Sequence, residues 1–373
     1  MFKLPTSPAF VIDQQVLQES IELLNDLRAQ SGCRVLYSIK ALPLIPLLEW
    51  LKPHVDGFSV SSLFEAQLAY EVLDKRQSIH LTTPGIRPDE IIQLSQICSH
   101  ISFNSLSQQQ IFSSAEHEPV SQGLRVNPKL SFAPDKRFDP CRLHSKLGVD
   151  IHVIDAQHIA DISGLHIHTV FSQCDYASLL QTLDKLQLQL GEYFTQLQWL
   201  NLGGGYLFKA IDDHQGFIQL IRTLRQKYDL DVYIEPGKAV IGDAVSLVAT
   251  VIDCFVSDGK TIAVLDSSIN HNPEVFEYQR QPEVLESNEL GVYQVMLVGS
   301  TCLAGDVFGE YTFTQAVKIG DTISFPKVGA YTLVKANRFN GYNYPDIYSV
   351  DAGVLNCLKR YDYSDYRKHW LAD

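Results

Sequence analysis

The chain has 373 residues, enough for two domains, and its composition of 45% hydrophobic and 20% charged residues is typical of a folded globular protein. A formal net charge of −13 argues against a nucleic-acid partner, because phosphate binding needs a basic surface. No apolar run approaches the roughly 18 residues of a membrane span, and the first residues lack a secretion signal. We therefore expect a cytoplasmic protein with no membrane partner.

Eight short apolar runs follow one another through about the first 240 residues, and each ends in polar residues or glycine. Segments with helical periodicity separate them, and this alternation predicts parallel strand pairing. The runs cover residues 34–40, 57–62, 79–85, 100–105, 123–128, 164–170, 199–205 and 232–237. Such units form either an open sheet or a closed (β/α)8 barrel, and a length of about 230 residues favours the TIM-like barrel.

The pattern changes after about Ala244, where apolar stretches alternate with turn residues and helical periodicity is nearly absent. This pattern predicts an antiparallel β domain. The run AFVID near the N-terminus is a further strand that could join it. We therefore predict an α/β fold with a barrel over residues 14–244 and a β domain built from residues 1–13 and 245–373.

Four of the predicted barrel strands end in groups that can do chemistry, and barrel enzymes gather their catalytic residues at such strand ends. A desolvated Lys40 amine can form an imine, and glycines 203–205 let backbone N–H groups approach an anion. Glu235 can pair with a protonated ring nitrogen. Taken singly, Lys40 also fits a lysine that extends from a strand end to solvent. The glycines also fit a flexible loop, and Glu235 also fits a structural hydrogen-bond acceptor. Together with His168 they form the combination that pyridoxal phosphate requires.

Metal binding is a weaker interpretation of the same region. Alternation along HIH places His166 and His168 on one strand face, but no third ligand has a convincing spacing. The seven cysteines contain no CxxC pair, which predicts neither a disulfide framework nor a zinc site. We therefore predict no metal.

With YSIK, HIH, GGG and EPG in this order, the chain resembles the alanine-racemase-like, fold-type-III pyridoxal-phosphate decarboxylases over nearly its whole length. Within them it is most similar to the carboxynorspermidine/carboxyspermidine decarboxylase family. The resemblance implies that Lys40 carries the cofactor, that His168 stacks on its ring, and that Glu235 pairs with the ring nitrogen. Four glycines are then expected at the cofactor, with the first three holding its phosphate: Gly203, Gly204, Gly205 and Gly237.

Two later motifs, GSTCLAGD and GAYTLVKANRFNG, resemble the family's closing motifs, which act across a homodimer with shared active sites. The resemblance implies that Cys302 protonates the carbon that has lost carbon dioxide. Released Lys40 is an alternative donor. Without the resemblance, Cys302 also fits an ordinary buried apolar thiol with no role in the reaction. Asp306 would contact the distal amine of the substrate or Lys146 across the dimer. The remaining residues of these motifs are expected to bind the cofactor phosphate, in the case of Tyr331, and to shape the substrate end, in the case of Phe339, Asn340 and Gly341.

Two departures from the family pattern bear on the substrate. Phe171 and Ser172 stand where Cys-Glu is expected, and Lys238 stands where a glutamate usually follows EPG. A polycationic substrate would lose two attractions, unless the substrate carries an anionic arm that Lys238 binds. Three carboxylates could compensate at the substrate: Asp175, Asp266 and Asp306.

The resemblance implies decarboxylation of a small-molecule substrate, carboxynorspermidine or carboxyspermidine, to norspermidine or spermidine and carbon dioxide in polyamine synthesis. Two alternatives stay open. One is a related decarboxylase for another diamino-acid or siderophore-type amine. The other is a cofactor-binding protein with weak catalysis, which the presence of both Lys40 and Cys302 argues against.

Overall fold

The computed structural model describes residues 4–74 and 76–372, and the chain divides into two compact units. One unit is Ser20–Val240, and the other joins the chain up to Glu19 with the chain from Ile241 onward. The domain limits expected from the sequence, 14–244 against 1–13 with 245–373, stay a prediction. Within these predicted domains, residues 1–3, 75 and 373 lie outside the part of the chain that the structure describes.

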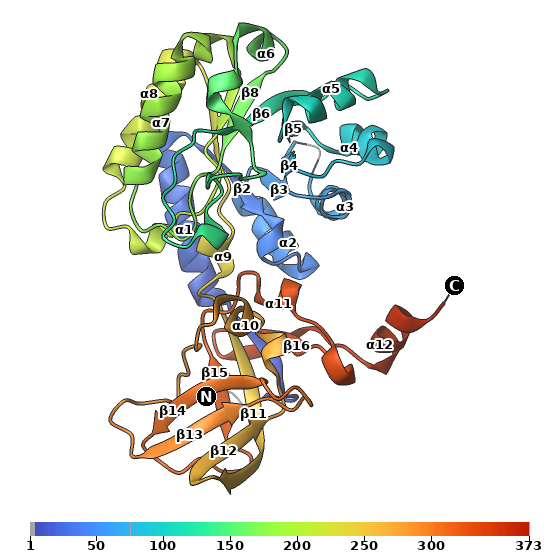
Figure 1. Cartoon of the computed structure of the whole chain (residues 1–373), viewed down its shortest axis with the longest axis vertical. Helices are drawn as coiled ribbons and strands as arrows, with labels where there is room; N and C mark the ends of the chain where they lie inside the picture. The colour runs from blue at the N-terminus through green and yellow to red at the C-terminus, as the bar shows by residue number, and fades with distance from the viewer. Residues whose placement is uncertain (1–3, 75, 373) are drawn as a thin grey trace. The chain divides into compact units, whose positions relative to one another are not determined.

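In the first unit, eight parallel strands of the described chain close into a barrel (Figure 1). They are β2 (Arg34–Ser38), β3 (Gly57–Val60), β4 (Ser78–Thr83), β5 (His100–Phe103), β6 (Ser121–Asn127), β8 (Gly164–Ile167), β9 (Trp199–Asn201) and β10 (Asp231–Ile234). Neighbours pair in chain order, and the β10–β2 pairing closes the ring. The two-residue strand β7 (Val149–Asp150) adds to β6 outside it. The predicted barrel is confirmed, and the open-sheet alternative is wrong.

Helices connect these strands and surround them (Figure 1). They are α1 (Gln14–Ser31), α2 (Ile45–Leu51), α3 (Leu63–Val72), α4 (Ile91–Ile97), α5 (Leu106–Ser114), α6 (Ala156–Ala160), α7 (Ala177–Leu190) and α8 (Gln215–Tyr228). Ser62 and Ser105 cap α3 and α5 by accepting hydrogen bonds from backbone N–H groups at 3.2 and 3.1 Å. Because every connection is a helical crossover, the carboxyl ends of all eight strands meet at one mouth.

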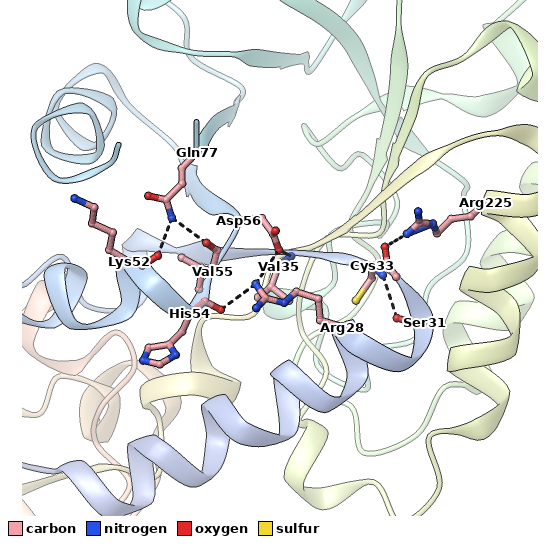
Figure 2. Close-up of polar contacts among 11 residues, drawn as sticks. Arg28, Ser31, Cys33, Val35, Lys52, His54, Val55, Asp56, Gln77 and Arg225 are labelled. Carbon is pink, nitrogen blue, oxygen red and sulfur yellow. Dashed lines mark hydrogen bonds and ion pairs between the residues drawn. The ribbon is translucent and has the colours of Figure 1, made fainter. Parts of the chain in front are cut away.

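Polar side chains fix where the first two barrel strands begin (Figure 2). The Asp56 carboxylate accepts a hydrogen bond from the Val35 N–H at 2.8 Å and pairs with Arg28 of α1 at 3.5 Å. Gln77 donates to two backbone carbonyls of the turn before β3, at 2.7 and 2.9 Å. These contacts set the register of β2 against β3, and thereby the position of Lys40 beyond the other end of β2.

A stacked pair of histidines lies near the beginning of β4 and β5. The His80 and His100 rings have centroids 3.8 Å apart, and Trp199 and Tyr233 pack around them. Both ring nitrogens of His80 are buried without a hydrogen-bond partner among the described residues. Burial lowers the pKa of His80 well below its usual value, and burial lowers the pKa of His100 to about 4.

The second unit is an eight-stranded sheet of the described chain, in the order β14-β13-β12-β11-β1-β16-β17 with β15 also on β11. Its strands are β1 (Ala9–Asp13), β11 (Val245–Ser257), β12 (Lys260–Leu265), β13 (Tyr293–Val298), β14 (Val307–Phe313), β15 (Thr322–Phe325), β16 (Asp346–Asp351) and β17 (Val354–Lys359). The AFVID segment joins this sheet as β1, which pairs with β11 and β16.

The sheet is mixed, which corrects the prediction of a purely antiparallel domain. Most neighbours are antiparallel, but β1–β16 and β12–β13 are parallel. Neither parallel pair is joined by a hairpin, because β1 comes from the other end of the chain and a long segment separates β12 from β13. Short helices flank or interrupt the strands: α10 (Glu274–Tyr278), α11 (Thr332–Lys335) and α12 (Tyr363–Trp370). The helix α9 (Lys238–Ile241) spans the point where the chain passes from the barrel unit into the sheet unit. No helix in the described chain is long and apolar enough to cross a membrane.

The histidine pair makes the stability of the barrel depend on pH. Both folded pKa values lie below the unfolded value of about 6.5, so neutral imidazoles stabilise the fold fully above that pH. The contribution is lost as the pH falls from about 6.5 towards about 4. A shift like that of His100 corresponds to at most about 3 kcal/mol, reduced because solvent partly reaches His100.

Urea denaturation followed by circular dichroism at several pH values checks this expectation. His80→Phe keeps an aromatic ring but cannot take a proton, so its free energy of unfolding should fall less between pH 6.5 and pH 4 than that of the unmodified chain. His369→Gln, at an exposed position of α12, is the control. Equal pH dependence in all three proteins would contradict the assignment.

Candidate active site

The barrel mouth contains a hollow of about 450 Å³. Its lining includes Lys40, Arg125, His166, His168 and Glu235. These residues come from the ends or interiors of β2, β6, β8 and β10, so strands far apart in the sequence contribute to one site. The convergence expected for Lys40, His168 and Glu235 is therefore present.

Lys40 lies in a short turn (Ile39–Ala41) immediately after β2. Its side chain lines the hollow and is partly exposed to solvent. Partial removal of the amine from water lowers the pKa of Lys40, Glu235 opposes the shift, and Arg125 adds to it. A lowered pKa raises the fraction of neutral amine, which is the nucleophilic form.

Glu235 is buried at the end of β10, with 6% of its surface exposed. Asn201 Nδ2 donates to Oε1 at 2.8 Å, and His166 Nε2 lies 3.3 Å from Oε2. Burial alone would raise the pKa of Glu235, but His166, Lys40 and Asn201 together lower it well below its usual range. We assign His166 as neutral with its proton on Nε2, because burial lowers its pKa and its Nδ1 has no partner within the described chain.

His168 and the three glycines form one unit of structure. The Gly204 N–H donates to His168 Nδ1 at 3.2 Å, which leaves the proton of a neutral ring on Nε2. Burial lowers the pKa of His168 well below its usual value, in agreement with a neutral ring. A Cβ atom on Gly204 would lie 2.2 Å from the backbone oxygen of Glu235, and Gly203 and Gly205 have φ of 67° and 98°. Only glycine fits this close turn.

These residues fit pyridoxal phosphate. The glycine turn carries no side chains, so a phosphate can approach its backbone closely, Lys40 offers an amine of lowered pKa, and Glu235 offers a carboxylate to a ring nitrogen. Gly237 brings the EPG turn against β2, since a Cβ there would lie 3.1 Å from the Cβ atoms of Ser38 and Ala41. The turn after Glu235 and the turn that carries Lys40 are therefore in contact.

The departures from the expected acidic positions contact one another. Lys238 Nζ lies 3.4 Å from Ser172 Oγ and 5.7 Å from the centroid of the Phe171 ring. Phe171 in turn stacks on Phe138, with centroids 5.3 Å apart, and both rings line the hollow. A cation and two aromatic rings therefore occupy the region where two carboxylates were expected.

Two further candidates, Cys302 and Asp306, lie in the sheet unit. Cys302 is an exposed free thiol in the loop of residues 299–306. Asp306, at the end of this loop, is only 3% exposed; Oδ1 accepts from the Ile269 N–H at 2.9 Å and Oδ2 from the Thr301 N–H at 3.1 Å. Both carboxylate oxygens of Asp306 thus accept hydrogen bonds from residues of the sheet unit. A contact of Asp306 with substrate or with Lys146 stays a prediction.

The sheet unit also contains the residues that are expected near the cofactor phosphate and the substrate end. Burial raises the pKa of Tyr331 to about 12, and Tyr331 has a left-handed φ of 67°. Phe339 is 46% exposed, and Asn340 accepts a hydrogen bond from the Cys302 N–H at 2.8 Å. Asp266 is bound within the sheet, where its carboxylate accepts from the Thr250 N–H at 2.9 Å. The cofactor and substrate roles of these residues stay predictions.

Sequence reasoning missed the roles of three polar residues of the barrel site, although it considered His166 as a metal ligand. Arg125 lines the hollow, and His166 and Asn201 hold Glu235. Two signals were available, since an arginine inside the apolar run GLRVNP is unusual, and alternation already placed His166 beside His168. The structure shows His166 facing a carboxylate.

The family described as "Pyridoxal-dependent decarboxylase, C-terminal sheet domain" matches residues 9–329. The chain belongs to this family. Its cofactor is therefore pyridoxal 5'-phosphate, and its class of reaction is decarboxylation, as the resemblance implied.

Curated relatives span nearly the full length of the chain. A carboxyaminopropylagmatine decarboxylase of Synechocystis sp. is 34% identical, covering 97% of this chain and 94% of the relative. A carboxynorspermidine/carboxyspermidine decarboxylase of Campylobacter jejuni is 33% identical, covering 96% and 97%. The solved C. jejuni carboxynorspermidine decarboxylase with norspermidine has a TM-score of 0.85 at 30% identity, covering 98% of this chain and all of the other. Diaminopimelate decarboxylase of Helicobacter pylori shares the fold, with a TM-score of 0.82 at 18% identity.

Glu235→Gln tests the role of the buried carboxylate. The amide keeps the shape but lacks the negative charge that holds a proton on the ring nitrogen, so decarboxylation should fall by orders of magnitude while the cofactor stays bound. Carbon dioxide release and the visible absorbance of the cofactor imine check the two parts separately. Glu289→Gln, at an exposed position, is the control, and near-normal turnover of Glu235→Gln would remove Glu235 from this role.

Proposed function

We propose that the chain decarboxylates an amino-acid-terminated polyamine, carboxynorspermidine or carboxyspermidine, to norspermidine or spermidine and carbon dioxide. The observation that carries the proposal is the hollow in which Lys40 faces an ionised Glu235 held by Asn201 and His166. Relatives named for this activity, at 33% identity over nearly the whole chain, support the substrate. The cytoplasmic location expected from the sequence stays a prediction.

Bound pyridoxal phosphate supplies an electron sink for the electron pair left when carbon dioxide departs. Glu235 would hold a proton on the ring nitrogen by its negative charge, and Asn201 and His166 keep this carboxylate in place. A cationic residue at the same position would weaken the sink, so the carboxylate favours decarboxylation over racemisation. Residues 203–205 would hold the phosphate of the cofactor, and the neutral His168 presents a flat ring held by Gly204.

The residues of the chain also handle the protons. The Lys40 amine, with its lowered pKa, gives up a proton readily and can take one back at Nζ. Either Cys302 Sγ or Lys40 Nζ then delivers a proton to the substrate carbon that has lost carbon dioxide. Cys302 is exposed and free, which suits a donor.

A second candidate function is decarboxylation of a diamino-acid or siderophore-type amine with an anionic arm. The specific observation is the charge around the hollow, whose lining contains four basic side chains besides Lys40 and two carboxylates. The four are Arg125, Arg137, Arg142 and Lys146, and the carboxylates are Asp139 and Glu235. Lys238 beside Ser172 adds a further cation next to Phe171.

A substrate panel with measured carbon dioxide release tests the proposal. Carboxynorspermidine and carboxyspermidine should give the highest kcat/KM, compared with carboxyaminopropylagmatine, meso-diaminopimelate and a citryl-diamino acid. Borohydride reduction and peptide mapping should find the cofactor on Lys40, and Lys40→Ala is the inactive control. Faster turnover of an anionic substrate would favour the second candidate, and no turnover of any compound would overturn both.

We infer that the active form is a homodimer with shared sites. Cys302 belongs to one compact unit and Lys40 to the other, and the family resemblance implies that the sheet unit of one subunit serves the barrel of its partner. Two-fold symmetry would then give two equivalent sites.

Mixing two variants that each lack one reacting group tests the shared site. Lys40→Ala and Cys302→Ala chains, mixed in equal amounts, should recover up to about a quarter of the full activity, since half the dimers are mixed and each has one intact site. The separate variants are the controls, and mass spectrometry of tagged chains verifies exchange. Verified exchange without recovered activity would contradict a shared site.

A further inference from the structure

Three consecutive residues of the loop that carries Cys302 are each held by a different side chain. The Tyr342 hydroxyl donates to the Ser300 carbonyl at 2.7 Å. The Asp306 carboxylate accepts from the N–H and the hydroxyl of Thr301. The Asn340 Oδ1 accepts from the Cys302 N–H at 2.8 Å. The backbone is therefore fixed at the thiol and at the two residues before it.

The loop and the side chains that hold it share one support, the segment of residues 267–271. Ser300 N–H donates to the Ser267 carbonyl at 2.9 Å, and the Ile269 N–H donates to Asp306 at 2.9 Å. Asn337, which begins the turn that contains Asn340, bonds Asn270 through its backbone N–H and its amide, both at 3.1 Å. The loop that contains Cys302 and the turn that contains Asn340 are thus both hydrogen-bonded to the segment of residues 267–271.

The conformation of Asn340 suits this role. Its φ of 56° and ψ of 15° lie in the left-handed region, which asparagine tolerates better than most residues, and Gly341 follows with φ of 76°. The Phe339 N–H donates to Asn337 Oδ1 at 3.0 Å and closes the turn Phe339–Gly341. The tight turn directs the Asn340 amide at the Cys302 backbone.

We propose that Asn340 and Tyr342 are positioning residues that hold Cys302 for protonation of the decarboxylated carbon. The inference rests on the proposed function, in which Cys302 is the proton donor. An exposed loop without regular structure has many conformations, and proton transfer needs the donor within hydrogen-bond reach of the carbon. Fixing the backbone beforehand removes that cost from the reaction. Asn340 acts on Cys302 through this hydrogen bond, and the role at the substrate end expected from the sequence stays a prediction.

The products distinguish a misplaced donor from a merely weakened fold. In the normal reaction, R–CH(NH2)–COOH gives R–CH2–NH2 and carbon dioxide, with the proton from Cys302 Sγ on the carbon. If the proton arrives at the cofactor carbon instead, R–CH(NH2)–COOH and the cofactor aldehyde give R–CHO, carbon dioxide and aminated cofactor. The water lost on joining substrate and cofactor is regained on hydrolysis, so the atoms balance. A weakened fold lowers the total rate but does not change this ratio.

Four variants separate the contacts. Asn340→Gly removes the amide at a backbone conformation that glycine adopts freely, and Asn340→Asp keeps an acceptor oxygen. Tyr342→Phe removes only the hydroxyl. Tyr344→Phe, in the same segment, is the matched control, because Tyr344 contacts Tyr361 and Arg338 through its ring.

The first measurement is hydrogen exchange of the Cys302 amide in the protein without substrate, followed by mass spectrometry of the peptide covering residues 299–306. Asn340→Gly should speed this exchange about fivefold, the usual effect of losing one hydrogen bond, while Asn340→Asp and Tyr344→Phe should not. Unchanged exchange in Asn340→Gly would overturn the contact. This readout needs neither cofactor nor turnover.

The second measurement is the ratio of aldehyde to amine produced from carboxynorspermidine. Asn340→Gly and Tyr342→Phe should raise the aldehyde fraction and lower kcat with little change in KM, and the other two variants should match the unmodified chain. Cys302→Ala is measured alongside. If it leaves the ratio unchanged, Cys302 is not the donor and that part of the proposed function fails. If Cys302→Ala raises the aldehyde fraction but Asn340→Gly and Tyr342→Phe do not, the positioning inference alone fails.

Discussion

The buried charge of Glu235 is the constraint on which the rest of the barrel site depends. An ionised carboxylate inside a protein is costly unless charges and hydrogen bonds compensate it. Asn201 from β9, His166 from β8 and Lys40 after β2 supply that compensation. The strands β8, β9 and β10 are consecutive neighbours, but β2 lies beside β10 only because the barrel closes. Closure of the fold and ionisation of the carboxylate are therefore linked.

One amide connects this carboxylate to the phosphate-binding turn. Asn201 donates to Glu235 through Nδ2 and accepts from the Gly203 N–H through Oδ1 at 2.9 Å, so its two contacts fix its orientation. The next N–H along the turn, that of Gly204, sets the protonation of His168. The groups expected to face the ring nitrogen, the phosphate and the ring face thus belong to one hydrogen-bond network. A change at any one of them should alter the others.

The sequence predicted the barrel and several site residues because their signals are local. A buried strand is recognised in the sequence as an apolar run, and each of Lys40, His168 and Glu235 follows or ends such a run. Asn201 and Arg125 lie within strands, and their roles depend on neighbouring strands that are far away in the sequence. The parallel pairing of β12 and β13 was missed for the same reason, since it depends on the path of the long segment between them.

Asp306 shows why a motif identifies a residue more reliably than it identifies its role. A carboxylate accepts hydrogen bonds equally well from the ammonium group of a substrate and from backbone N–H groups, and only the fold decides which donors are near. Here the donors are Ile269 and Thr301, so the last residue of GSTCLAGD fixes the loop that carries its cysteine. Asn340 of the second motif acts on the same loop from the other side. The two closing motifs therefore contact each other in this chain, and the loop that bears the thiol is the point at which they meet.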